Sequence, residues 1–340
     1  MNINKKLLKW YYKNKRELPW RKKSKEDLID SYYVWISEIM LQQTTVNTVI
    51  PYFNKFIQRF PNIHILASSS ISEVLKYWAG LGYYARARNL HKTAKIIVKR
   101  YNGVFPKNIV SLLELPGIGD YTAGAILSIA FNKVAFPVDV NIKRVVQRLS
   151  NNHEANKKDL AQYLDSSISR SKPGDFIEAL MDLGSQICKS SSPKCELCPL
   201  NKDCETFLKN KSMLSSKKIN YIKKPVKYGL CLIIERTKDQ KYFFIRRPEE
   251  GLYGGMLSLP TSNWVINKNL LSKEKVLNFD GLSYKKDKVV HVFSHFQLEL
   301  FICYKKDLVL NEMKGKWIKK EEARSQLPSL MKKVLDKFIH

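Results

Sequence analysis

One short stretch of this 340-residue chain holds four of its six cysteines, and it limits the possible folds more than any other feature. The four are Cys188, Cys195, Cys198 and Cys204, in the spacing C-x6-C-x2-C-x5-C. The N-terminus has no apolar run of signal-peptide length, and clustered cysteines in an intracellular chain indicate a metal centre rather than disulfides. Four thiolates can hold zinc or a four-iron cluster, so the ligand chemistry alone leaves both open.

Charge is the second constraint. Lysine and arginine number 59 against 31 aspartates and glutamates, which gives a formal net charge of +28. Such an excess in a chain of globular composition indicates a polyanionic partner, although a generally lysine-rich composition would also produce it. The chain has no stretch of about 18 consecutive apolar residues, so we expect no membrane span and a soluble, intracellular protein.

The pattern of apolar residues divides the chain in two, as expected for a length that exceeds one typical core. Apolar residues recur at helical spacing from Tyr32 to about Phe131 and again up to the cysteines. Residues 207–226 are rich in lysine and serine and predict an exposed linker. Beyond Lys227, β-branched and aromatic runs alternate with turns and end in a helix over EEARSQLPSLMKKVLDKF, which predicts an α+β domain.

Residues 113–130, LELPGIGDYTAGAILSIA, read as an apolar stretch, a Pro-Gly-x-Gly turn and a helix. Gly117 and Gly119 leave backbone N–H groups free at the start of that helix, where a DNA phosphate can bind. This pattern is typical of the helix-hairpin-helix, which grips the nucleic-acid backbone without reading its sequence. The alternative is an ordinary hairpin in a helical core.

Two carboxylates lie in contrasting settings. Asp139 precedes the helix NIKRVVQRL, where helix amides can hydrogen-bond a carboxylate, and its simplest role is that of a helix cap. Glu38 stands among apolar residues in VWISEIMLQQT, and if buried it would have a raised pKa and could donate a proton near neutral pH. Taken singly, it could be an exposed glutamate on an amphipathic helix. Together the two carboxylates match the division of labour in glycoside cleavage.

These segments resemble the adenine DNA glycosylases of the MutY type, within the endonuclease III superfamily. The resemblance covers roughly the first 205 residues almost continuously. Besides the cysteine spacing, the segments that carry it are LPWR (18–21), SEIMLQQT (37–44), GLGYYARARNLHKTA (80–94), LPGIGDYTAGAILS (115–128), VDVNIKR (138–144) and MDLGSQIC (181–188).

The resemblance implies a multidomain fold. An all-α helix-hairpin-helix glycosylase region would occupy residues 1–206, and a MutT/Nudix-like α+β domain would occupy 227–340. Within the first region, a six-helix barrel would cover about 29–135, and an iron–sulfur cluster domain would combine 1–28 with 136–206. The resemblance assigns the four cysteines to one [4Fe-4S] cluster and places bent DNA between the two helical parts.

The resemblance also assigns the chemistry. Glu38 would protonate adenine N7 and activate the water, while Asp139 would stabilise the oxocarbenium ion. Tyr121 and Asn141 would be their neighbours. Related bifunctional enzymes have a lysine where Tyr121 stands, and a phenol cannot form their Schiff base, so we expect a monofunctional glycosylase with water as the nucleophile.

The glycosidic bond is unreachable in a stacked duplex, so the adenine must be extruded. By resemblance, a wedge and an intercalating aromatic would fill the stack it leaves, supplied by Leu41, Gln42, Gln43 and Tyr83. The other expected DNA contacts are Arg86, Gly117, Gly119 and Lys143.

The C-terminal domain resembles the MutT-like domain with which this family senses 8-oxoguanine. Its landmark is HVFSHFQLELFICY, in which Phe293, Ser294 and His295 match the recognition loop. A hydroxyl and an imidazole can read an oxidised purine by hydrogen bonds, whereas the alternative is an ordinary strand and turn. No acidic metal-binding helix follows Pro260, so we expect binding without hydrolysis. The chain departs from the family pattern at Val140, usually Gly, and at Leu257 and Ser258, usually a Trp-Glu pair.

The expected partner is double-stranded DNA with adenine opposite 8-oxoguanine or guanine, bound by a monomeric, cytoplasmic and nucleoid-associated enzyme. Two rival functions stay open. One is an endonuclease III-like pyrimidine glycosylase with lyase activity, which Tyr121 and the added domain disfavour. The other is a non-catalytic iron–sulfur DNA-binding protein, which the presence of both Glu38 and Asp139 disfavours.

Overall fold

The computed structural model describes residues 3–22, 29–209, 224–248, 251–277, 279, 287–310, 314–324 and 326–339. Its contacts divide the chain into two compact units. We call Met1–Ser68 with Asn89–Ile219 the helical unit, and Ser69–Arg88 with Asn220–His340 the sheet unit. Residues 210–223, the greater part of the expected linker, lie outside the described residues.

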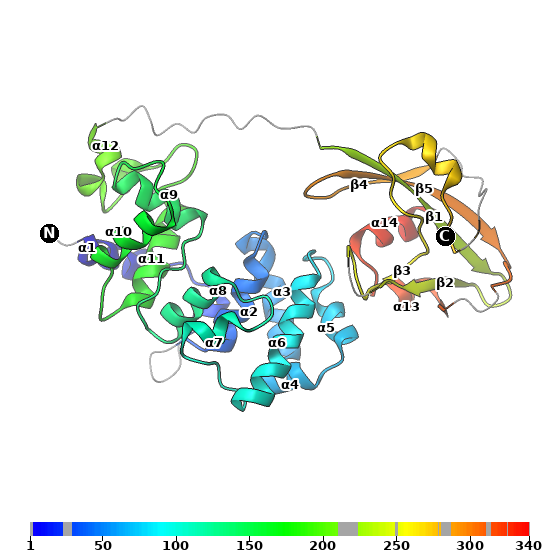
Figure 1. Ribbon diagram of the computed structural model, residues 1–340, viewed down its shortest axis with the longest axis horizontal. Helices are drawn as coiled ribbons and strands as arrows, with labels where there is room; N and C mark the ends of the chain where they lie inside the picture. Colours follow the sequence, from blue (N-terminus) through cyan, green and yellow to red (C-terminus); the bar gives the residue numbers. More distant parts are fainter. Residues whose placement is uncertain are drawn as a thin grey trace. The chain divides into compact units, whose positions relative to one another are not determined.

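The helical unit is built mostly from short helices joined by turns and longer loops (Figure 1). Its first elements are α1 (Ile3–Asn14), η1 (Pro19–Arg21), α2 (Ser31–Leu41), α3 (Val46–Arg59), α4 (Ile63–Ser68) and most of α6 (Ala85–Tyr101). They are followed by α7 (Ile109–Leu113), α8 (Asp120–Ala125), η2 (Ile126–Ala130), α9 (Val140–Leu149), α10 (Lys157–Ser167) and α11 (Pro173–Gln186). The cysteine stretch contains η3 (Cys195–Leu197) and η4 (Asn201–Asp203), and α12 (Glu205–Lys209) follows.

A continuous core joins the N-terminal helix α1 to α9, α10 and α11, far away in the sequence. Leu7 of α1 is fully buried in one apolar cluster with Phe176 and Leu180 of α11. Gly174 permits the close approach of α11 to η2, because a Cβ there would lie 2.5 Å from the carbonyl oxygen of Ser128. Packing of α1 against α11 brings the LPWR segment next to the MDLG segment, and the site depends on this juxtaposition.

The stretch 113–130, in which a helix-hairpin-helix was expected, contains the last residue of α7, a turn, α8 and η2, and the first helix of the hairpin begins earlier, at Ile109. Asn108 caps α7, since its side chain accepts a hydrogen bond from the amide of Ser111 at 2.9 Å. Gly117 has φ +81, a backbone conformation that a side chain would strain, and Gly119 is the N-cap of α8. The turn therefore requires glycine at position 117.

The sheet unit contains a six-stranded mixed sheet of order β3-β2-β1-β5-β4, with β6 paired to β2. Its strands are β1 (Val226–Arg236), β2 (Lys241–Arg246), β3 (Leu257–Ser258), β4 (Lys288–Val292), β5 (Gln297–Lys306) and β6 (Lys316–Ile318). Strands β1 and β5 are parallel and the other pairs antiparallel. The helices are α13 (Lys320–Arg324) and α14 (Ser329–Phe338), with η6 (Lys268–Lys273) and, by its contacts, α5 (Ile71–Trp78). The helical region followed by an α+β domain confirms the expected fold class.

Two details differ from the sequence expectation, and a third concerns a departure from the family pattern. The single helix expected at the C-terminus is two helices, α13 and α14, because Pro328 disfavours helical geometry at the residue before it. Helix α12 extends to Lys209 and β1 begins at Val226, so both ends of the expected linker belong to regular elements. Leu257 and Ser258, where the family pattern has a Trp-Glu pair, are both buried and form β3.

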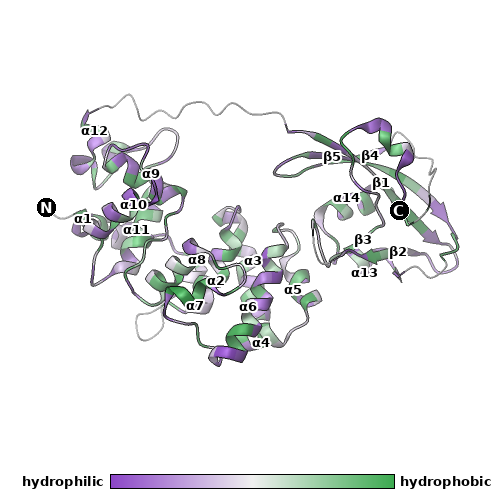
Figure 2. Ribbon diagram, viewed as in Figure 1, coloured by the Kyte–Doolittle hydropathy of each residue, from purple (hydrophilic) through white to green (hydrophobic). Residues whose placement is uncertain are grey.

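Hydrophilic and hydrophobic bands alternate along the longer helices, α6 among them (Figure 2). Within the residues that the structure describes, no helix is both long enough and apolar enough to cross a membrane.

Candidate active site and cysteine cavity

Glu38 lies on α2, a helix whose start is fixed by Asp30, which accepts a hydrogen bond from the amide of Tyr32 at 2.8 Å. Only 6% of Glu38 is exposed. This burial is the main reason that the pKa of Glu38 is raised to about 7. The carboxyl can therefore hold a proton near neutral pH, as its apolar sequence neighbours suggested.

Tyr121 and Asp139 face Glu38 from two other elements. The Tyr121 hydroxyl on α8 donates a hydrogen bond to Glu38, and burial raises the pKa of Tyr121 well above its usual value, so it stays a phenol. Asp139 caps α9, accepting from the amide of Ile142 at 2.6 Å and from Asn141 Nδ2 at 2.8 Å. The charge of Asp139 further raises the pKa of Glu38. The structure thus brings together the four residues that the sequence offered as catalytic.

A second charged group behind Glu38 was missed by the sequence reasoning. Arg21 on η1 lies between two carboxylates of α11, with Nε 2.6 Å from Glu178 Oε1 and Nη1 2.8 Å from Asp182 Oδ2. Glu38, Arg21 and Glu178 border one small cavity. Trp20 and Leu41 supply part of its apolar wall. The sequence signal that could have found this group is that LPWR and MDLG are among the segments that resemble the family. Neither segment had been given a chemical role.

Arg144 connects the elements that carry the candidate catalytic residues to the cysteine stretch. Its Nη2 donates to Asn141 Oδ1 at 2.7 Å, and its Nε donates to the backbone carbonyl of Cys188 at 2.7 Å. Asn141 in turn bonds Asp139. The position of Asp139 is therefore fixed both by the start of its helix and by the hydrogen bonds that connect it through Asn141 to Arg144.

The DNA-contact candidates of the helical unit lie near the same cavity or on exposed positions of neighbouring helices. Leu41 ends α2 and borders the cavity, while Gln42 is partly buried. Gln43 is exposed with φ +59, a conformation uncommon for a residue with a side chain. Lys143 is exposed on α9, and Gly119 leaves the first amides of α8 without a side-chain cap.

Tyr83 and Arg86 belong to the sheet unit. The Tyr83 side chain is 39% exposed at φ +48. Arg86 turns toward its own loop, where Nη2 donates to the carbonyls of Leu81 and Gly82 at 3.2 Å each, and its guanidinium lies over the Tyr83 ring. Burial lowers the pKa of Arg86 to about 10. In this structure Arg86 supports the loop that presents Tyr83, and its expected DNA contact stays a prediction.

The expected recognition loop is a tight turn between β4 and β5. The amide of Phe293 donates to the carbonyl of Phe296 at 2.8 Å, and this closes the turn with Ser294 and His295 exposed at its tip. The Phe293 ring stacks on Trp264 with centroids 5.8 Å apart. Within the same unit, Ser294 also forms a hydrogen bond with Tyr83. Two expected DNA-reading groups that are distant in sequence thus lie side by side.

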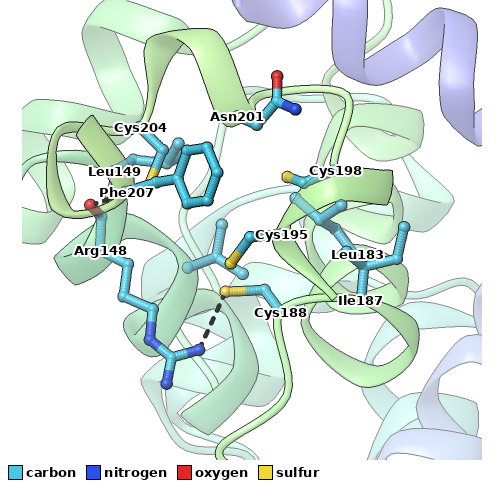
Figure 3. Close-up of a pocket in the computed structure, with 11 residues that line it drawn as sticks. Arg148, Leu149, Leu183, Ile187, Cys188, Cys195, Cys198, Asn201, Cys204 and Phe207 are labelled. Carbon is cyan, nitrogen blue, oxygen red and sulfur yellow. Dashed lines mark hydrogen bonds between the residues drawn. The ribbon is translucent and has the colours of Figure 1, made fainter. Parts of the chain in front are cut away.

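The four clustered cysteines border one cavity, which Figure 3 shows with its lining. The remaining lining is mostly apolar, including Leu183, Ile187 and Phe207, and Arg148 is its one charged side chain. Arg148 Nη1 lies 3.4 Å from the sulfur of Cys188. In the described part of the chain, no three His, Cys, Asp or Glu side chains are grouped so that they could hold a single metal ion. Four thiols around one apolar cavity with a cationic neighbour do fit a cluster whose ligands carry negative charge.

Family models match segments in both the helical and the C-terminal parts of the chain. Residues 36–170 match the HhH-GPD superfamily of base excision DNA repair proteins, and residues 230–337 match the NUDIX domain. The adenine DNA glycosylase of Buchnera aphidicola (subsp. Baizongia pistaciae) is 36% identical over 98% of this chain and 95% of its own length.

Solved structures give a similar result for the helical region. A thermostable thymine-DNA glycosylase aligns with a TM-score of 0.56 and 31% identity, covering 61% of this chain and 95% of that one. Endonuclease III, trapped as a covalent intermediate with DNA, aligns with a TM-score of 0.52 over 61% of this chain and 94% of its own. At 24% identity, this second likeness concerns the fold alone.

Proposed function

The chain belongs to the adenine DNA glycosylases, a family of base excision repair enzymes that act on DNA, and from this premise we propose that it removes adenine mispaired with 8-oxoguanine or guanine. The observation that carries the proposal is the buried Glu38 facing Asp139. Its pKa of about 7 suits a group that must give up a proton at neutral pH.

Glu38 acts as the acid. Adenine leaves slowly as an anion, so protonation of its N7 by Glu38 as the bond to the sugar breaks makes it a neutral leaving group. The base must first be extruded, since the glycosidic bond is enclosed in a stacked duplex. After departure of the base, the ionised Glu38 can accept a proton from the attacking water.

Asp139 opposes the positive charge that develops on the sugar. Its two oxygens are held by the amide of Ile142 and by Asn141, so it needs no rearrangement when the charge forms. Tyr121 donates its hydrogen bond to Glu38, and as a phenol it forms no Schiff base with the sugar. Water is therefore the nucleophile, and the enzyme is monofunctional.

The cavity at Glu38 is our candidate site for the extruded base. Trp20 and Leu41 offer apolar surface to a flat ring, and Arg21 and Glu178 offer hydrogen-bonding groups to its polar edge. A purine with both donors and acceptors on its edge suits a wall that carries one cation and one carboxylate.

The cysteine cavity is our candidate site for a [4Fe-4S] cluster held by Cys188, Cys195, Cys198 and Cys204. When bound, such a cluster would fix the loop between α11 and α12, and Arg148 would offset part of its negative charge. The chain's own contribution is to hold this loop against α9, from which Arg144 connects to Asn141.

Recognition of the opposite base is assigned to Ser294 and His295, with Phe293, partly buried and stacked on Trp264, as the anchor of their loop. The remaining expected contacts, from Gln43, Tyr83, Lys143 and the glycine turn, would hold the phosphate backbone and the opened stack. We propose that the enzyme works as a monomer on chromosomal DNA inside the cell.

A single-turnover assay on matched duplexes tests the function. We expect adenine to be excised opposite 8-oxoguanine fastest, opposite guanine more slowly, and opposite thymine hardly at all. Incubation with an abasic duplex and borohydride tests the rival, because a lyase would be trapped covalently and a water-using enzyme would not. Excision of a damaged pyrimidine with no action on adenine would refute the proposal.

A further inference from the structure

Asp182 is the most completely enclosed charged side chain near the catalytic residues, with none of its side-chain surface exposed. It accepts hydrogen bonds from the Arg16 amide at 3.0 Å and from Arg16 Nε at 2.6 Å. It also accepts from Arg21 Nη1 at 2.8 Å and Nη2 at 3.1 Å. A buried carboxylate with two guanidinium partners strongly fixes the geometry of both. No catalytic step described above uses Asp182.

Arg21 is the residue through which Asp182 can act. Its fork faces Asp182, while its Nε faces Glu178, whose other oxygen accepts a hydrogen bond from the Tyr11 hydroxyl at 2.8 Å. Arg21 also borders the cavity that contains Glu38. The Arg21 guanidinium is thus held on one side by Asp182, which does not border the cavity, and on the other by Glu178, which does.

We propose that Asp182 is a positioning residue for the excision reaction, which holds the Arg21 guanidinium on α11 and so keeps its charge from shifting toward Glu38. The inference rests on the proposed function of Glu38 as the acid.

The groups that face Glu38 show why the position of Arg21 matters. After burial, the strongest influences on the pKa of Glu38 are the hydrogen bond from Tyr121, which lowers it, and the charges of Asp139 and Glu178, which raise it. Arg21 lowers it. Loss of the Asp182 charge leaves Arg21 less neutralised and freer to approach Glu38, so the pKa of Glu38 falls. Glu38 then holds its proton over a narrower range of pH.

Asp182→Asn tests the proposal, because the amide keeps the size and an acceptor oxygen but lacks the charge. We expect the alkaline limb of the single-turnover pH profile to move to lower pH by about half a unit or more. Affinity for a duplex with an uncleavable adenine analogue should stay within about threefold. Asp165→Asn is the matched control, since Asp165 forms an exposed ion pair with Arg170 and its loss should leave the limb in place.

Arg16→Gln gives a second test with the opposite sign. Arg16 is 27% exposed, so the variant should fold even if Asp182→Asn does not. Without Arg16, Asp182 carries more uncompensated charge and holds Arg21 alone, so the limb should move to higher pH. The proposal would be overturned if the alkaline limbs of the two variants moved in the same direction, or if excision became slower with no movement of the limb.

A double-variant cycle identifies the intermediary. In an Arg21→Gln background, Asp182→Asn should shift the limb by less than half as much as it does in the unaltered protein. An equal shift in both backgrounds would show that Asp182 acts without Arg21. If the unaltered protein excises no adenine, the proposed function itself fails. If it excises adenine and the variants leave its limb unmoved, only this inference fails.

Discussion

The helical unit and the sheet unit hold their candidate functional groups in opposite ways. In the helical unit, Glu38 is 6% exposed and Asp182 is completely buried, and each has named polar partners from other elements. In the sheet unit, Ser294 and His295 are exposed at the tip of a turn. The turn is held in place by contacts of the Phe293 ring with Trp264 and Phe296.

This difference matches two physical tasks. Charge development in a transition state is stabilised best by groups fixed in advance in a dry site, where interactions between charges are strong. Recognition of a base that arrives with the DNA requires groups still able to exchange water for a new partner. Changes in the helical unit should therefore alter the rate of excision on every substrate, whereas changes at the recognition loop should alter the ratio between substrates.

The largest expected effect is that of Glu38→Gln. The amide cannot protonate adenine, so single-turnover excision should fall by about 10²–10⁴-fold opposite 8-oxoguanine and guanine alike. Duplex affinity, measured by fluorescence anisotropy, should change by no more than a few-fold. A variant that excises at a nearly normal rate would remove Glu38 from the mechanism.

The pH dependence of excision is the next largest effect. Burial raises the pKa of Glu38 to about 7, and the acid is active only while protonated. The single-turnover rate should therefore be highest below pH 7 and should fall roughly tenfold for each unit well above it. Binding measured across the same range separates this limb from loss of the complex. A flat profile from about pH 6 to 9 would contradict the raised pKa.

Short motifs explain which parts of this site the sequence could predict. Glu38, Tyr121 and Asp139 each lie in a segment whose own sequence indicates a function, and the spacing of the four cysteines indicates a metal centre. Arg21 and Asp182 lie in the resembling segments LPWR and MDLGSQIC, but nothing local in those segments indicates chemistry, and Glu178 lies in neither. Arg21 is far along the chain from the other two and meets them only when η1 packs beside α11. The break between α13 and α14 was readable from Pro328, whereas the inward turn of Arg86 depends on the conformation of its loop.

A smaller effect is expected from the double variant Ser294→Ala, His295→Ala. Each lost contact to the opposite base should cost about 1–3 kcal/mol, so the preference for 8-oxoguanine over guanine should fall by roughly tenfold or more. Excision opposite guanine should be little changed, because the loop lies in the sheet unit and the candidate catalytic residues lie in the helical unit. Equal slowing on both duplexes would mean that the loop serves general DNA binding or folding.

Val140→Gly should have the smallest effect. It tests whether the rate of excision depends on every residue of the helical unit or only on the buried ones. Val140 directly follows Asp139, yet it is 76% exposed and takes the first position of α9. The partners of the Asp139 carboxylate are Ile142 and Asn141, so the Val140 side chain adds nothing to its position. Glycine is the residue that the resembling family usually has there. It should lower the free energy of unfolding by no more than about 1 kcal/mol and leave excision within about twofold. A much larger change in the rate, with an unaltered melting temperature, would show that the valine itself shapes the backbone beside Asp139.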